Sequence, residues 1–302
     1  MSLPANLSPN ARGALWMLAS TGCFTAMAIL LKILVREDYP ESQMVFFRCA
    51  AGMVAVAPFL LRAGPAALAV KRPWVVLRRC AFSTLGFFAG FYAFAHLPLA
   101  DSQAISFSRV LFVTVLAVWL LKERVGMRRW VAVGIGFAGV LVMLRPTGGE
   151  APSIAVIAAL ASAFLFGVTL VTVKDLTRDH STLTLVAWTN IFTTVVGLPF
   201  AFLAWKQPDL TDFALFLAMG FAGVGAQSCY VRALSSADAS LMGLIDYVRL
   251  PLAIFFGWLI FAEKPDAFML VGAGVIIAST VYITWRETRE PALTSPDKGN
   301  PP

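Results

Sequence analysis

Three basic residues and one acid lie inside long apolar stretches of the sequence. Arg48, Arg109 and Arg249 are the basic residues, and Asp246 is the one acid that stands well inside such a stretch. A charge inside a membrane segment is costly, so it usually faces a bundle interior or a water-filled cavity. These residue types predict recognition of a charged substrate or transfer of a proton.

Asp246 and Arg249 are three residues apart, so they share one face of a helix and can pair. One interpretation is that Asp246 holds a substrate ammonium group or a coupling proton. The other is that the two charges only neutralise each other, and the sequence leaves both open. Pro251 removes a helix hydrogen bond and predicts a hinge beside this pair. Arg48 lies only about six residues inside its stretch, so its side chain can reach the membrane interface and it is a weaker candidate.

Polar and aromatic residues extend the predicted site into a cavity. Buried amides need hydrogen-bond partners, which makes Asn190 and Gln227 stronger candidates than a single aromatic residue. Most aromatic residues of a membrane protein pack together or face lipid. The complete set of predicted cavity residues is Tyr92, Ser106, Arg109, Trp188, Asn190, Gln227, Tyr230, Asp246 and Arg249.

Four charged residues stand at the ends of apolar stretches. Glu123 and Glu263 each follow such a stretch, and one interpretation makes them gates. The alternative is that they anchor the chain at the interface or cap a neighbouring helix. Lys32 and Lys174 are gate candidates of the same kind, and the alternative for them is that they extend their side chains to the interface.

The elements that must position these residues occur twice. Residues 92–123 and 230–263 both open with Tyr, pass through Ala-Asp, and carry an Arg fourteen residues before a final Glu. The dipeptide Pro58-Phe59 recurs as Pro199-Phe200. One duplicated unit therefore covers 13–145 and 152–285. Repeats that span whole membrane segments are typical of transporters with a site between the halves.

Composition indicates a polytopic membrane protein. Hydrophobic residues make up 59% of the chain and charged residues 14%, whereas a soluble domain has about half and about a quarter. The apolar blocks are long enough to cross a bilayer. We expect an all-α protein with ten transmembrane helices, at about 13–35, 42–62, 76–96, 101–122, 128–145, 152–173, 182–204, 211–233, 238–261 and 266–285.

The positive charges of the connecting segments predict the orientation. Sixteen Lys and Arg residues fall on one side of the membrane and five on the other, which places both termini in the cytoplasm. Because each unit has an odd number of spans, the two halves form inverted repeats around a central cavity. We expect a cytoplasmic tail at 1–12, a periplasmic linker at 146–151 and a disordered cytoplasmic tail at 286–302.

Enzymatic and nucleic-acid functions find little support. The net charge of +7 reflects basic cytoplasmic loops facing anionic lipid rather than nucleic-acid binding. The two histidines, His96 and His180, stand in or beside loops on opposite sides and have no partners for a metal site or a nucleophile. We expect no enzyme activity, no cofactor and no metal.

The Glu-ended helices WLLKE at 119–123 and WLIFAE at 258–263, together with the two five-span units, resemble the EamA-type branch of the drug/metabolite transporter superfamily. The resemblance covers about 13–285. It implies a bacterial inner-membrane protein that moves amino acids or other small metabolites by alternating access, through a central cavity between the halves. It does not assign a substrate to the candidate residues.

We expect a secondary-active transporter that exports amino acids or related small metabolites. Arg suits a substrate carboxylate, Asp an ammonium group and the aromatic rings a side chain. The expected partners are a small-molecule substrate, the lipid bilayer and coupling protons. Two alternatives stay open: an uptake or exchange carrier for a larger metabolite such as S-adenosylmethionine, and a non-transporting membrane scaffold, which would have a sealed bundle centre.

Overall fold

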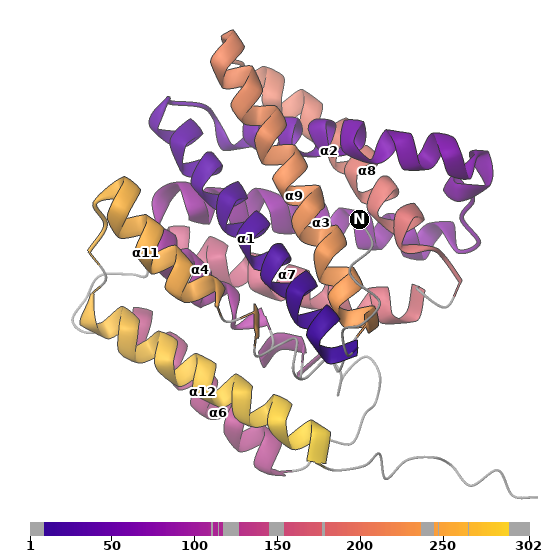
Figure 1. Ribbon diagram of the computed structural model, residues 1–302. Coiled ribbons are helices and arrows are strands. Elements are labelled where there is room, and N and C mark those ends of the chain that lie inside the picture. Colours follow the sequence, from indigo (N-terminus) through magenta and orange to yellow (C-terminus); the bar gives the residue numbers. More distant parts are fainter. Residues whose placement is uncertain are drawn as a thin grey trace, which may run out of the picture.

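The computed structural model describes residues 9–109, 111–113, 115–116, 127–144, 154–176, 179–236, 245–246, 248–264 and 266–289. The described residues are almost entirely helical and none of them forms a strand (Figure 1). The elements of the first half are α1 (Pro9–Arg36), α2 (Glu41–Ala63), the short 3-10 helix η1 (Pro65–Leu68), α3 (Pro73–His96), α4 (Leu99–Ser106) and α6 (Met127–Leu144). Those of the second half are α7 (Ile154–Leu176), α8 (Thr182–Leu203), α9 (Leu210–Ser236), α11 (Arg249–Phe261) and α12 (Ala267–Arg289).

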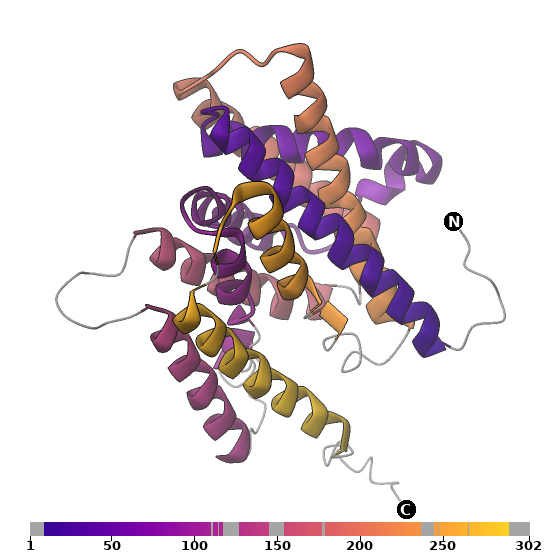
Figure 2. The ribbon, with the colours of Figure 1, turned by 60° about the vertical axis from the view of Figure 1, so that its left-hand side comes forward.

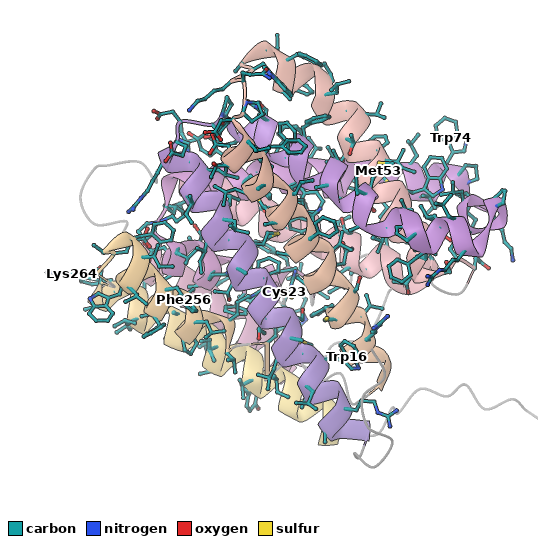
Figure 3. All side chains as sticks on the ribbon, turned by 45° about the horizontal axis from the view of Figure 1, so that its top comes forward. Trp16, Cys23, Met53, Trp74, Phe256 and Lys264 are labelled. Atoms are coloured by element: carbon teal, nitrogen blue, oxygen red, sulfur yellow. The ribbon has the colours of Figure 1, made fainter. Side chains whose placement is uncertain are left out.

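Several helices have the length and composition of membrane spans. Within the described residues, five qualify: Ala11–Arg36, Glu41–Ala63, Ile154–Thr172, Thr182–Leu203 and Leu210–Ala233. Large apolar side chains face outward, among them Trp74, which is 80% exposed and projects away from the bundle (Figure 3). An exposed apolar surface of this extent needs lipid to cover it. The prediction of an all-helical membrane protein is confirmed in this form, whereas ten spans in inverted repeats stay a prediction.

The main helix contacts join the first half of the chain to the second. Helix α1 packs along α9, α3 along α7, α2 on α8, and α6 along α12. The α6–α12 pair stands at one side of the bundle in both views (Figures 1 and 2). Helices α2 and α9 approach closely at Gly220, where an added Cβ would lie 2.3 Å from the Cβ of Ala51. Small residues at such crossings allow backbones in a membrane to pack tightly.

Two helical segments are interrupted at matching places. Helix α4 ends at Ser106, a turn follows at 107–108, and the chain becomes helical again at Arg109. In the second half, a turn at Val248 precedes Arg249, the first residue of α11. The backbone N–H of Val248 reaches back three residues, to the oxygen of Ile245, at 3.0 Å, which is the tight spacing of a 3-10 turn. Interrupted membrane helices place backbone ends and polar side chains near transporter binding sites.

Candidate functional site

Four of the predicted cavity residues come together beside these interruptions. The Oδ2 atom of Asp246 lies 3.4 Å from Nη2 of Arg249, so the two form the ion pair that their spacing predicts. The side chain of Tyr230, on α9, interacts electrostatically with Arg109, Asp246 and Arg249, so all three lie near it. The cluster therefore combines a residue that follows α4 with residues of α9 and of the segment leading into α11.

Two aromatic rings hold the Arg249 guanidinium in place. Its central carbon lies 4.4 Å from the ring centre of Phe24, on α1, and 5.0 Å from that of Phe107. The Arg249 side chain is only 4% exposed, so both rings contact a largely desolvated cation. Cation–π contacts of this kind contribute about 2 kcal/mol when water is excluded. The sequence analysis did not single out Phe24 or Phe107.

The cluster carries more positive than negative charge. Arg109 and Arg249 each bring a guanidinium group, which counts as one formal positive charge. Asp246 supplies the carboxylate of the cluster, so an excess of one positive charge remains among these described residues. An anionic substrate group would balance that excess and form bidentate hydrogen bonds with a guanidinium.

Ser106 and Gln227, two more of the predicted cavity residues, lie at the end of α4 and on α9. The Ser106 hydroxyl donates to the backbone oxygen of Gln103 at 2.7 Å, so it is engaged at the end of α4. Gln227 is half-buried on α9, three residues before Tyr230 and on the same helix face. Gln103 itself is fully buried, and neither atom of its amide has a hydrogen-bond partner among the described residues. A buried amide in that state is a further candidate that the sequence analysis missed.

Trp188 and Tyr92 make their contacts elsewhere. The indole N–H of Trp188 donates to the backbone oxygen of Leu68 at 3.0 Å and so ties η1 to α8. Tyr92 stacks on His96 at the end of α3, with ring centres 4.1 Å apart. The hydrogen bond and the ring stacking lie apart from the charged cluster, and a cavity role for Trp188 and Tyr92 stays a prediction.

Asn190 is buried between helices. It is 1% exposed, and its Nδ2 donates to the backbone oxygen of Val186 at 2.9 Å. Its Oδ1 has no hydrogen-bond partner among the described residues. An added Cβ on Gly52 would lie 2.8 Å from that oxygen, so the glycine makes room for the amide between α2 and α8.

Two further arginines are buried, and Arg48 lies deeper than the sequence predicted. Arg48 is 5% exposed and does not extend to the interface; its guanidinium stands 4.2 Å from the ring centre of Phe87. Arg79 falls inside the predicted span 76–96 and lies on α3, which begins at Pro73. Its Nη1 donates to Thr189 Oγ1 at 2.7 Å and its side chain is buried. The predicted span at 42–62 nearly coincides with α2, so the burial of Arg48 reflects the orientation of this helix about its axis.

Pro251 does not weaken its helix in the expected way. It is the third residue of α11, in the first turn, where backbone N–H groups have no partner within the helix. A proline at this place removes no hydrogen bond and favours the start of a helix. The interruption lies before it, at Val248, so a hinge would be located there.

Lys32 and Glu263, two of the predicted gate residues, form an ion pair. The pair joins α1 to the segment that follows α11. The other carboxylate oxygen of Glu263 accepts the backbone N–H of Leu99 at 2.7 Å, which is the first residue of α4. Glu263 therefore caps a neighbouring helix and pairs with Lys32 at once, and its role as a gate stays a prediction.

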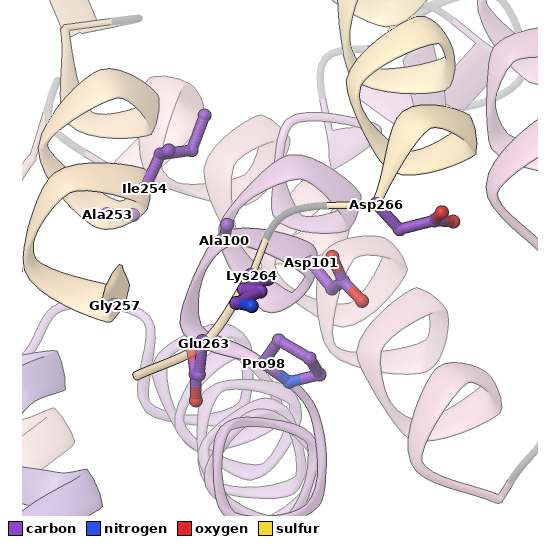
Figure 4. Close-up of a pocket in the computed structure, with 9 residues that line it drawn as sticks. All are labelled: Pro98, Ala100, Asp101, Ala253, Ile254, Gly257, Glu263, Lys264 and Asp266. Atoms are coloured by element: carbon purple, nitrogen blue, oxygen red, sulfur yellow. The ribbon is translucent and has the colours of Figure 1, made fainter. Parts of the chain in front are cut away.

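A small cavity adjoins this ion pair (Figure 4). Its volume is about 90 Å³, and its lining comes from the start of α4, the middle of α11 and the segment after α11: Pro98, Ala100, Asp101, Ala253, Ile254, Gly257, Glu263, Lys264 and Asp266. Metabolite sites measure roughly 300–1,000 Å³, so this hollow is suited to water rather than to substrate. The Glu263 carboxylate can therefore be hydrated from one side. The remaining gate candidates, Glu123 and the side chain of Lys174, lie outside the described residues.

Comparison with known proteins agrees with this architecture. The model of the EamA-like transporter family matches the chain twice, at residues 11–145 and 153–285. The chain belongs to the EamA-like transporter family. This membership places it in the drug/metabolite transporter superfamily that the repeated segments resemble. Each matched segment contributes to the charged cluster, Arg109 from the first and Tyr230, Asp246 and Arg249 from the second.

Curated relatives of this family member are named as transporters. The riboflavin transporter of Rhizobium johnstonii is 29% identical over 279 residues, covering 92% of each chain. The S-adenosylmethionine uptake transporter of Rickettsia prowazekii is 28% identical, covering 92% of this chain and 94% of the relative. The pseudopaline exporter CntI of Pseudomonas aeruginosa is 26% identical, covering 90% and 95%. The relatives thus include importers and exporters of small metabolites.

A solved structure shares the fold. Described as "Crystal structure of protein", it superposes with a TM-score of 0.67 over 92% of this chain and 98% of that chain, at 17% sequence identity. At this identity the likeness concerns the fold alone. The family match and the names of the relatives make transport the function class of this chain.

Proposed function

We propose that this chain is a secondary-active transporter of the bacterial inner membrane that exports amino acids or related small metabolites by alternating access. The observation that carries the proposal is the charged cluster of Arg109, Tyr230, Asp246 and Arg249. Residues of both matched segments meet there, beside two interrupted helices. In transporters built from inverted repeats, this is where substrate binds.

Each member of the cluster has a role that its chemistry supports. Arg249, held between Phe24 and Phe107, binds the substrate carboxylate through its paired N–H groups. Asp246 binds an ammonium group or carries the coupling proton. The Tyr230 hydroxyl supplies a hydrogen bond, and the two phenylalanine rings contact the apolar part of the substrate.

The helix pairing supports inverted repeats at 13–145 and 152–285. If α1 and α3 of the first unit correspond to α7 and α9 of the second, the α1–α9 and α3–α7 contacts are symmetry equivalents. The Lys32–Glu263 pair joins the two units at one end and acts as a gate there. With both termini in the cytoplasm, that end is periplasmic.

Contacts between loops agree with the predicted division of the loops into two sides, which leaves the orientation to be tested. Tyr39 donates a hydrogen bond to Asp212, which joins two segments expected outside. The backbone N–H of Lys71 donates to His180, which joins two segments expected inside. Single cysteines at Gly149 and Ser181, in a chain without native cysteines, test the assignment. An impermeant reagent applied outside should label position 149 only, and labelling of 181 alone would reverse the orientation.

Transport in proteoliposomes tests the function. A panel of labelled amino acids is offered with and without an imposed pH gradient, using wild type and Asp246→Asn. If Asp246 carries the proton, the variant loses gradient-driven accumulation but keeps exchange. If it binds the ammonium group, exchange falls as well, by at least tenfold. A folded variant that does both at the wild-type rate would leave Asp246 as a structural partner of Arg249.

The relatives favour a second candidate, uptake of a larger metabolite. Those named as riboflavin and S-adenosylmethionine transporters cover almost the whole chain. The same proteoliposomes loaded on either side with riboflavin or labelled S-adenosylmethionine decide between the candidates. Accumulation of either compound, with no amino acid moved, would replace amino-acid export as the function.

A further inference from the structure

Arg48 is a buried cation for which the described part of the fold supplies no carboxylate. It lies on α2 and is 5% exposed. Its Nη1 reaches Cys49 Sγ at 3.5 Å, and its Nε has no hydrogen-bond partner among the described residues. The ring of Phe87, on α3, covers one face of the guanidinium at 4.2 Å.

The other buried arginines are compensated differently. Arg249 pairs with the carboxylate of Asp246, and Arg79 donates to Thr189 Oγ1 and to the backbone oxygen of Leu185. Desolvating a charge costs several kcal/mol, and a guanidinium cannot avoid that cost by losing its proton. The ring of Phe87 and a thiol offset only part of it. An anion that arrives from outside the fold would supply the rest.

Helix α9 leads from Arg48 to the charged cluster. Gly223, Gln227 and Tyr230 follow the i, i+4, i+7 spacing and so share one face. At Gly223 an added Cβ would lie 3.0 Å from Nε of Arg48, so the glycine leaves room for the guanidinium. Tyr230 stands beside Arg249 at the other end of this face. At 1.5 Å per residue, the two ends are about 10 Å apart.

Helix α1 also contacts both arginines, on another side. Phe24 contacts the Arg249 guanidinium, and Met27, one turn later, lies near Gly223 and Arg48: its sulfur would be 3.1 Å from a Cβ at position 223. Residues three apart share a helix face. Both α1 and α9 therefore place residues against the two arginines, with the half-buried amide of Gln227 between them.

We propose that Arg48, with Phe87 and Gly223, forms a second anion subsite about 10 Å from Arg249 along α9. The transported substrate then carries two anionic groups at that separation, with its central part beside Gln227. This deepens the proposed function and rests on it, because it selects elongated dianionic metabolites over short monocarboxylic amino acids.

Binding of a chain-length series to the purified full-length protein tests the subsite. The probes are succinate, adipate, suberate and sebacate, each beside its monoamide, which keeps the length and removes one charge. Thermal unfolding across a concentration range gives apparent affinities. We expect suberate and sebacate, whose extended carboxylates are about 10 Å apart, to bind at least tenfold tighter than their monoamides, and succinate to show little preference.

Arg48→Gln should reduce that preference to less than threefold. The matched control is Arg62→Gln, on the same helix, where the side chain is exposed and the same charge is removed. The control should keep the wild-type preference. An undiminished preference in Arg48→Gln would overturn the proposal, as would equal binding of diacids and monoamides by the wild type.

A second measurement needs no change at Arg48. Cys49 is in contact with the guanidinium, so in a chain where Cys23, Cys80 and Cys229 are serine, suberate should slow alkylation of Cys49 more than its monoamide does. Equal protection by both would contradict the subsite. Transport of amino acids with no diacid preference would refute the subsite and keep the proposed function. A preference for diacids in binding, with no transport of any probe, would support the subsite and refute the proposed function.

Discussion

Replacing Glu263 by Gln should open the end of the bundle at which we propose that the Lys32–Glu263 pair acts as a gate. The side chains of Lys32 and Glu263 are 11% and 21% exposed, so the pair lies between a buried and a surface ion pair. Removing one partner of a buried pair costs about 3–5 kcal/mol, and of a surface pair about 0–1 kcal/mol. The cavity beside Glu263 lets water reach the charges, which favours an intermediate cost of about 2 kcal/mol. Because each 1.4 kcal/mol is tenfold, the open population should rise roughly thirtyfold.

Cysteine labelling measures this opening. Ala253 lines the cavity and is fully buried, so a cysteine there, in a chain without native cysteines, reacts with an impermeant reagent only when this end opens. The labelling rate should rise roughly thirtyfold in Glu263→Gln. The glutamine oxygen can still accept the N–H of Leu99, so the start of α4 should remain intact. The matched control is Glu37→Gln, which removes an exposed carboxylate that belongs to no ion pair among the described residues.

The result that would refute this reasoning is an unchanged labelling rate in both Glu263→Gln and Lys32→Gln. A faster rate that arises from unfolding rather than gating is separated by a second cysteine position, Ala187, which is buried on α8 and does not line the cavity. The labelling rate at position 187 in Glu263→Gln should stay at the wild-type level. Equal acceleration at both positions would show general loosening of the fold.

Two further predictions concern packing and loop attachment. Gly52→Ala should destabilise the protein by about 1–3 kcal/mol, because its Cβ would lie 2.8 Å from a side-chain oxygen of α8. The control is Gly22→Ala, which should be neutral or slightly stabilising because nothing lies within 4 Å of the added Cβ. Thermal unfolding of the two variants compares their stabilities. Tyr39→Phe should cost about 1–2 kcal/mol by removing the donor to Asp212. Burial, and then the Asp212 carboxylate, raise the pKa of Tyr39, so the loss should be constant from pH 6 to 9 and shrink only where the unfolded tyrosine ionises, near pH 10.

Local spacing predicted the parts of the site that depend on neighbours along the chain. Asp246 and Arg249 are three residues apart on a helical turn, so their ion pair needs no knowledge of the tertiary fold. The recurrence of Glu at the end of both repeated segments drew attention to Glu263. Its partner Lys32 was a candidate because it also stands at the end of an apolar stretch, although only the structure places the two residues together.

The orientation of each helix about its own axis could not be predicted in the same way. A membrane helix is apolar on all sides, so the polar stripe that identifies the inner face of a soluble helix is weak. Arg48 was therefore expected near the interface, yet α2 turns it inward against Phe87. For the same reason nothing separated Phe24 and Phe107, which contact Arg249, from the other phenylalanines of the chain.

Helix α11 connects the charged cluster to the Lys32–Glu263 ion pair. It begins at Arg249 and ends at Phe261, so it spans roughly 20 Å from one to the other. Ala262 follows in the left-handed conformation, with φ of 56°, and the N–H of Glu263 turns back to the oxygen of Gly257 at 3.0 Å. This turn fixes the Glu263 carboxylate relative to the helix. A substrate anion that displaces Arg249 would therefore move Glu263 as well, because both are attached to the same rigid helix. Substrate binding at Arg249 could in this way change the ion pair between Glu263 and Lys32.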